Sequence, residues 1–145
     1  AMDDTVRNCA RGAALALVCL VSFTECFASF ADMVRVPALE EEALCVMDEL
    51  GMAHGPVAPP SGSSDVGNVS YRCPTIQPLV SICEDFHPLH TPEFQAVITC
   101  PAAHQAIAQG ARLIAALVYR TLTDGDFRQA LRTSWQGARK RKLEG

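Results

Sequence analysis

Residues 66–83 read VGNVSYRCPTIQPLVSIC, and this stretch decides the fold class that the sequence predicts. Its valine, isoleucine, threonine and tyrosine residues favour two short strands, Val66–Cys73 and Thr75–Cys83, which Pro74 divides. Pro78 lacks a backbone donor, so we expect the second strand to lie at a sheet edge or to bend. The centre of the chain is therefore predicted to be a small sheet.

Another strand is predicted at Leu17–Phe30, where apolar residues alternate with Ser and Thr. Periodicity and capping residues predict four helices around the strands: Asp3–Ala16, Ala38–Leu50, Ala102–Leu122, and a last helix capped by Asp124 that continues through Trp135. Pro37 and Gly51 mark the two ends of the second helix. The order helix, strand, helix, two strands and two helices predicts an α/β fold.

The helix Ala102–Leu122 is rich in small residues, which lets it approach a neighbour closely. Its residues that we expect on one packed side are Ala103, Ile107, Gly110, Ile114 and Leu117. The acidic run Glu40–Glu42 is interpreted instead as a solvated helix face.

The 145-residue composition excludes two broad classes of protein. Hydrophobic residues make up 49% and charged residues 19%, so most of the chain is not intrinsically disordered. The net charge is −4, which argues against a general nucleic-acid surface. Four of the 12 basic residues form the tail Arg139–Lys142.

The chain has seven cysteines, an odd number at irregular spacings and without a C-x-x-C pair. Most of them stand in apolar runs, so we expect buried free thiols in a reducing compartment. The alternative is a secreted disulfide protein, for which Asn68–Ser70 would be a glycosylation sequon. The cysteines are Cys9, Cys19, Cys26, Cys45, Cys73, Cys83 and Cys100.

The apolar stretch Gly12–Thr24 is uncharged, but its length of about 13 residues is short of the roughly 20 that a spanning helix needs. A signal peptide is disfavoured because Asp3 and Asp4 place negative charge ahead of the apolar stretch. We therefore expect a cytoplasmic protein without a membrane partner.

The loop-rich centre, residues 51–67, contains no recognisable phosphate-binding or nucleophile pattern. Its GSSDVGN stretch precedes a predicted strand, whereas a phosphate loop follows a strand and carries a lysine. Ser63 and Ser64 lack the flanking residues of a serine nucleophile. Asp65 is most simply a turn residue.

Two of the four histidines, His87 and His90, stand three residues apart in a second loop. Each is by itself most simply an exposed loop residue, and two histidines do not define a zinc site. A local metal site would need further ligands, of which the nearest candidates in sequence are Glu84, Asp85 and Glu93.

These two loops resemble a known family. The segments SSDVGNVSY (residues 63–71), CPTIQP (73–78) and LHTPEF (89–94) are similar to motifs of the di-zinc amidohydrolases of metallopeptidase family twenty. This family contains aminoacylases and carboxypeptidases, and the branch that the segments resemble most is that of aminobenzoyl-glutamate hydrolase and the aminoacylase-like dipeptidases. Arg72 and Cys73 depart from the family pattern, which is commonly apolar at these positions.

The resemblance implies a site and a division of the chain. His90 matches a zinc ligand, and Ser64, Asp65, Gly67 and Asn68 match the substrate side. Residues 1–36 would be a helix-strand piece of a ferredoxin-like dimerisation (lid) domain, 37–138 the C-terminal part of a zinc-exopeptidase-like α/β catalytic domain, and 139–145 a basic tail.

The family's His-x-Asp motif, its other zinc ligands and its general-base glutamate have no counterpart in these residues. We therefore expect a fragment of an enzyme for N-acyl amino acids or dipeptides, with no catalytic residue of its own, no zinc bound alone and no turnover alone. It would form a homo-oligomer or join a separate N-terminal half. The alternative is a non-catalytic assembly or dimerisation module. The individual substrate stays open.

Overall fold

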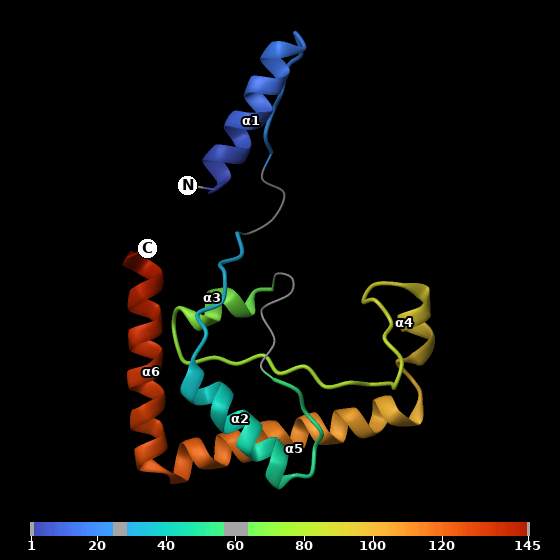
Figure 1. The fold of residues 1–145 in the computed structure, drawn as a ribbon, viewed down its shortest axis with the longest axis vertical. Coiled ribbons are helices and arrows are strands. Elements are labelled where there is room, and N and C mark those ends of the chain that lie inside the picture. The colour runs from blue at the N-terminus through green and yellow to red at the C-terminus, as the bar shows by residue number, and fades with distance from the viewer. Residues whose placement is uncertain (1, 25–28, 57–63, 145) are drawn as a thin grey trace.

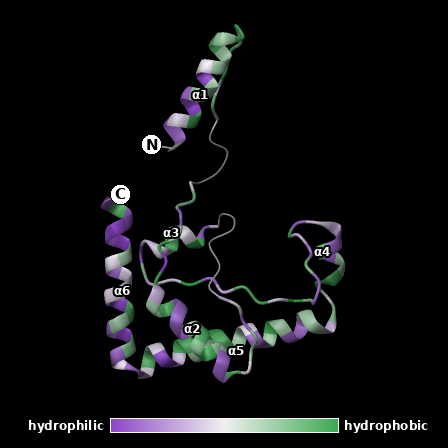
Figure 2. Cartoon of the chain, viewed as in Figure 1, coloured by the Kyte–Doolittle hydropathy of each residue, from purple (hydrophilic) through white to green (hydrophobic). Residues whose placement is uncertain are grey.

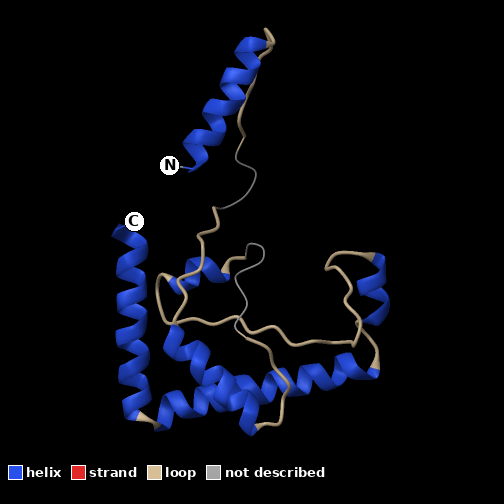
Figure 3. Ribbon diagram, viewed as in Figure 1, coloured by secondary structure: helices blue, strands red, loops and turns tan. Residues whose placement is uncertain are grey.

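The structure, a computed structural model, describes residues 2–24, 29–56 and 64–144. Its helices are α1 (Met2–Ala16), α2 (Pro37–Glu49), α3 (Val66–Ser70), α4 (Pro92–Val97), α5 (Pro101–Thr123) and α6 (Gly125–Glu144). Within those three ranges no β-strand is present (Figure 3). The predicted α/β fold class is therefore wrong, and the described chain is helical.

Each predicted strand takes another form. Val66–Cys73 begins as the short helix α3, in which the amide of Val69 donates to the carbonyl of Asp65 at 3.3 Å. Thr75–Cys83 is irregular chain, and so are residues 17–24 and 29–30 of the predicted strand Leu17–Phe30, whose residues 25–28 lie outside the described ranges. A strand needs a neighbouring strand for its backbone groups, and none lies beside these segments in the described chain.

The local signals for helix ends are confirmed. Pro37 stands in the first turn of α2. Pro92 and Pro101, either of which the sequence offers as a first-turn proline, open α4 and α5. The carboxylate of Asp124 accepts a hydrogen bond from the amide of Phe127 at 2.9 Å and caps α6. These signals act within one helical turn, so they do not depend on the rest of the fold.

Two helices end in the same hydrogen-bonding pattern, the Schellman motif. After α2, the amides of Gly51 and Met52 donate to the carbonyls of Asp48 and Met47, with Gly51 at φ 65°. After α1, the same two bonds place Val18 at φ 54°. Glycine takes this left-handed conformation without strain, whereas a β-branched valine is strained there.

The hydrophobic core forms where α2 lies against α5 and α6, which together make an L (Figure 1). Leu113 of α5 is fully buried and Val46 of α2 is 1% exposed. The core residues are Val36, Leu39, Ala43, Val46, Met52, Leu113, Leu117 and Leu131, with Met47, Leu50, Ile76, Val80, Ala116, Phe127 and Trp135 packed around them. The apolar residues that recur at helical spacing along α2, namely Leu39, Ala43, Val46, Met47 and Leu50, thus all lie in this core or pack against it, as their periodicity predicts.

Ion pairs join the same elements at the edge of the core. Arg120 of α5 binds both Glu42 and Glu49 of α2. Arg35 binds Glu40 with two hydrogen bonds of 2.7 and 2.9 Å. The acidic run of α2 is therefore not simply solvated, because two of its three glutamates are paired.

The face that α5 buries differs from the predicted one. Ala103 and Leu117 are buried as expected, and Ala106 and Leu113 join them. Ile107 and Ile114 are 69% and 57% exposed. The predicted buried face is wrong because α5 is apolar over a wide arc. Periodicity alone does not say which part of that arc other helices cover.

Helix α1 projects away from the other helices, with residues 19–24 returning alongside it (Figure 1). The guanidinium carbons of Arg7 and Arg11 lie 5.0 and 5.4 Å from the ring centroid of Phe23. These contacts fasten the returning chain to α1. Across the described residues, no helix has the length and apolar character needed to cross a membrane.

The six described cysteines are free thiols, but the expectation that they are buried is wrong. Cys83 and Cys100 are half-buried, whereas the other four are exposed: Cys9, Cys19, Cys45 and Cys73. Cys26 lies outside the described residues. Apolar sequence neighbours did not imply burial, because most of these runs lie in exposed parts of the chain.

The register of α5 can be tested with adjacent residues. Leu113→Ala should lower the free energy of unfolding by about 2–5 kcal/mol, because it leaves a cavity in the core. Ile114→Ala should change it by less than about 1 kcal/mol, because that side chain is mostly exposed. Chemical denaturation measures both. Equal losses for the two variants would contradict the observed register.

Candidate functional site

The loop that carries His90 has a defined backbone. His90 takes the left-handed conformation, with φ 64°. The next residue, Thr91, is the N-cap of α4: its hydroxyl accepts from the amide of Phe94 at 3.2 Å and donates to the carbonyl of Pro88 at 2.9 Å. Pro92 then opens the helix. A non-glycine residue at positive φ costs free energy and often marks a functional position.

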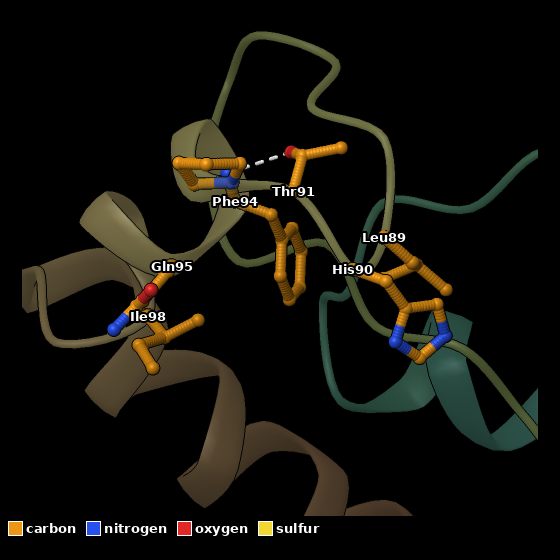
Figure 4. Close-up of a pocket in the computed structure, with 7 residues that line it drawn as sticks. Leu89, His90, Thr91, Phe94, Gln95 and Ile98 are labelled. Atoms are coloured by element: carbon orange, nitrogen blue, oxygen red, sulfur yellow. Dashed lines mark hydrogen bonds between the residues drawn. The ribbon is translucent and has the colours of Figure 1, made fainter.

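An open hollow of about 450 Å³ lies beside this loop. Its lining residues are Leu89, His90, Thr91, Pro92, Phe94, Gln95 and Ile98. Figure 4 shows His90 and Leu89 on one side, Gln95 and Ile98 on the other, and the Phe94 ring between them. In the described chain neither ring nitrogen of His90 makes a hydrogen bond. The imidazole is therefore available to an external ligand.

The local metal site is not formed. Within residues 2–24, 29–56 and 64–144, no three His, Cys, Asp or Glu side chains come together to hold a metal ion. Glu84, Asp85, His87, His90 and Glu93 all belong to these ranges, so they do not make a shared ligand set. By themselves these residues do not fit a zinc ion, which needs about three protein ligands.

The four residues predicted for the substrate side lie at and before α3. The Ser64 hydroxyl donates to Gln77 Oε1 at 3.2 Å, and Asp65 is exposed at the start of α3. Gly67 is buried against the backbone of Ala31. The predicted loop also includes Gly62 and Ser63, which lie outside the described residues.

Asn68 and Ser70 tie α3 to the chain segment 29–34. Asn68 Oδ1 accepts from the amide of Ala31 at 2.6 Å, and Asn68 Nδ2 donates to the carbonyl of Ser29 at 3.1 Å. Ser70 is fully buried, and its hydroxyl accepts from the amide of Val34 at 2.9 Å. The segment resembling the family motif therefore holds the fold together here, whatever else it binds.

Helix α6 contacts both α3 and segment 29–34. The indole Nε1 of Trp135 donates to the carbonyl of Ser70 at 2.7 Å. Asp32 binds Lys142 and accepts from the Tyr71 hydroxyl at 2.9 Å. The hydrogen bond with Lys142, then that with Tyr71, lowers the pKa of Asp32 below its usual range. Because the folded pKa is depressed, this stabilisation is present at neutral pH and is lost as the pH falls through that pKa.

His54, in the loop that follows α2, has a local role. The Nε2 atom of His54 lies 3.0 Å from Asp48 Oδ1, just past the end of α2. The hydrogen bond with Asp48, followed by that with the Gly55 carbonyl, raises the pKa of His54. Neither partner belongs to the hollow beside His90.

The segments around Asp65 and His90, which both resemble the amidohydrolase family, are not brought together in the described chain. Helix α3 lies beside α6, whereas α4 lies beyond the opposite end of α5 (Figure 1). Sequence reasoning also missed Tyr71, Arg72 and Arg139, which line a second hollow beside Asn68. No local signal could reveal this group, because Arg72 and Arg139 are distant in sequence.

Comparison with known proteins adds no relative. No protein-family model matches the chain, and no curated protein matches it. The resemblance to di-zinc amidohydrolases consequently rests on the sequence motifs alone.

The close approach at Gly67 yields a stability test. A Cβ atom at this position would lie 1.9 Å from the carbonyl oxygen of Ala31, so Gly67→Ala should lower the free energy of unfolding by at least about 1–3 kcal/mol. Gly12→Ala is the matched control: nothing lies within 4 Å of its Cβ position. Because Gly12 is inside a helix, that variant should be stabilised by about 0.5–1 kcal/mol. Thermal unfolding that ranks Gly67→Ala as the more stable variant would contradict the packing of α3.

Proposed function

We propose that this chain supplies one zinc ligand, His90, to a zinc-dependent amidohydrolase that hydrolyses N-acyl amino acids or dipeptides. The observation that supports the proposal is the backbone at His90. Its left-handed conformation, followed by the Thr91 cap and Pro92, presents an imidazole with no hydrogen bond in the described chain at the edge of a hollow. Such strain is common at ligand-binding residues.

In this proposal the metal would activate a water molecule for attack on an amide carbonyl. The residues of this chain would hold and orient the reacting groups. His90 would offer a neutral ring nitrogen, while Thr91 and Pro92 fix the loop from which it projects. The remaining zinc ligands and the general base would come from segments with the family's His-x-Asp and acidic-pair motifs. The chain by itself is then expected to bind no zinc and to have no activity.

The substrate side is assigned to Ser64, Asp65, Gly67 and Asn68. Asp65 has an exposed carboxylate that makes no hydrogen bond or ion pair in the described chain. Gly67 and Asn68 are already engaged with segment 29–34, so their part would be to hold Asp65 and Ser64 in place. We also propose a cytoplasmic location, because the free thiols of the six described cysteines suit a reducing compartment.

The histidine assignment is tested in a polypeptide or reconstituted complex that contains the His-x-Asp and acidic-pair segments. His90→Ala should abolish hydrolysis of acyl amino acids and lower the zinc content, because a methyl group cannot replace a ligand. His87→Ala should reduce activity by no more than about 10–100-fold, the effect of a residue that supports a ligand. If His87→Ala were the more damaging change in a zinc-loaded sample, the assignment of His90 would be wrong.

An assembly module is the second candidate function, and the second apolar face of α5 favours it. This exposed stripe consists of Ile107, Ile114, Val118 and Leu122, which are 51–72% exposed. Residues spaced seven and four apart lie along one side of a helix. Figure 2 shows that α5 is predominantly hydrophobic along its middle. A partner, either a second copy or a separate N-terminal half, would bury this stripe and gain about 25 cal/mol per Å² of apolar area.

The assembly proposal predicts that the purified chain is not a monomer. Ile114→Glu with Val118→Glu should shift light-scattering mass toward the monomer, because two charges would be buried in the contact. Arg112→Glu is the control, since Arg112 is exposed on α5 outside the exposed stripe. A wild-type chain that stays monomeric at high concentration would contradict assembly through the stripe.

A further inference from the structure

A second hollow, of about 440 Å³, lies between α3, segment 29–34 and α6. Its lining residues are Ala31, Asn68, Tyr71, Arg72 and Arg139. It is separate from the hollow beside His90 and shares no lining residue with it. Two of its five lining side chains are guanidinium groups, which makes it a positively charged recess.

The two arginines have no acidic partner in the described chain. Arg35 and Arg120, by contrast, are held by glutamates. Asp32, which binds the lining residue Tyr71, is occupied by Lys142 and by the hydroxyl of Tyr71. Among the described residues, the charge of Arg72 and Arg139 is therefore not neutralised by a carboxylate.

Arg139 is also held in position. Its guanidinium carbon lies 5.7 Å from the ring centroid of Trp135, and the hydrogen bond from Trp135 to Ser70 fixes that ring. The Nε atom of Arg139 is enclosed and has no hydrogen-bond partner among the described residues. A cation that is oriented before a ligand arrives loses less entropy on binding.

We propose that this hollow binds the phosphate group of a small phosphate ester. Guanidinium groups present paired N–H donors that match the oxygens of a phosphate, and two of them balance its two negative charges. The hollow is much larger than a phosphate ion, so it has room for an esterified organic group. Asn68 and Tyr71 complete its wall. The end of α6 that carries Arg139–Lys142, hydrophilic and purple in Figure 2, adds positive charge that attracts anions.

The test uses the whole chain and three probes at low salt: inorganic phosphate, glycerol 3-phosphate and acetate. Calorimetric titration should show one saturable site for the two phosphates, with acetate at least about tenfold weaker. Arg72→Gln and Arg139→Gln should each weaken phosphate binding by at least about tenfold, the effect of losing a charge-assisted hydrogen bond. Arg132→Gln, a change at an exposed arginine of the same helix, should leave it unchanged.

Three outcomes would overturn the proposal. They are the absence of saturable phosphate binding, acetate binding as tight as phosphate, and an equal loss in Arg132→Gln, which would mean diffuse attraction to basic residues. Arg139→Gln also removes a contact with Trp135, so circular dichroism must show that it folds. Should it not fold, Arg72→Gln decides the question, because that exposed side chain is not packed in the core.

Discussion

The buried hydrogen bonds of Ser70 are the constraint on which much of the structure depends. Its hydroxyl accepts from Val34 and donates to the carbonyl of Gly67, and its own carbonyl accepts from Trp135. One residue thus joins the segment before α2, the helix α3 and the helix α6. A buried polar group must be satisfied or it costs free energy, so these three parts are fixed relative to one another.

These hydrogen bonds explain why residues 64–72 serve the fold and also two proposed sites, the substrate side and the positively charged hollow. Gly67 lets α3 approach Ala31, and Asn68 completes the contact by bonding to the backbone of segment 29–34. The same packing sets Trp135 beneath Arg139 and places Asn68 in the wall of the cationic hollow. The segment that resembles an amidohydrolase motif therefore has a structural role, because it holds α3, segment 29–34 and α6 together. Any ligand that it binds depends on these contacts.

The apolar surface of helix α5 is a second constraint on the structure. One side of it forms the core with α2 and α6, and the exposed stripe faces away from them. A helix that is apolar over most of its circumference is usually covered on both sides. The enzyme proposal and the assembly proposal agree on this point, because both require a further polypeptide surface. They differ in whether His90 takes part in chemistry.

The sequence alone determined the long helices and most of their ends, although α6 runs on to Glu144, through the predicted basic tail. Proline at the first turn of α2 and α5, Gly51 after α2 and the cap at Asp124 act through contacts within a few residues, so they could be predicted correctly. The sequence also indicated the His90–Thr91 loop and the residues around α3 as candidate binding residues. What these residues would bind was inferred from resemblance, and the structure supplies their backbone setting.

Only the tertiary structure decided the fold class, the buried side of α5 and the grouping of Arg72 with Arg139. Strand prediction failed at Val66–Cys73 and Thr75–Cys83 because a strand depends on a partner elsewhere in the chain, whereas a helical turn is completed by its own carbonyls. The two arginines come from α6 and from the chain just after α3, and they meet because Ser70 and Trp135 dock those elements together. Contacts between residues so far apart in sequence carry no local pattern, and for that reason they are decided by packing.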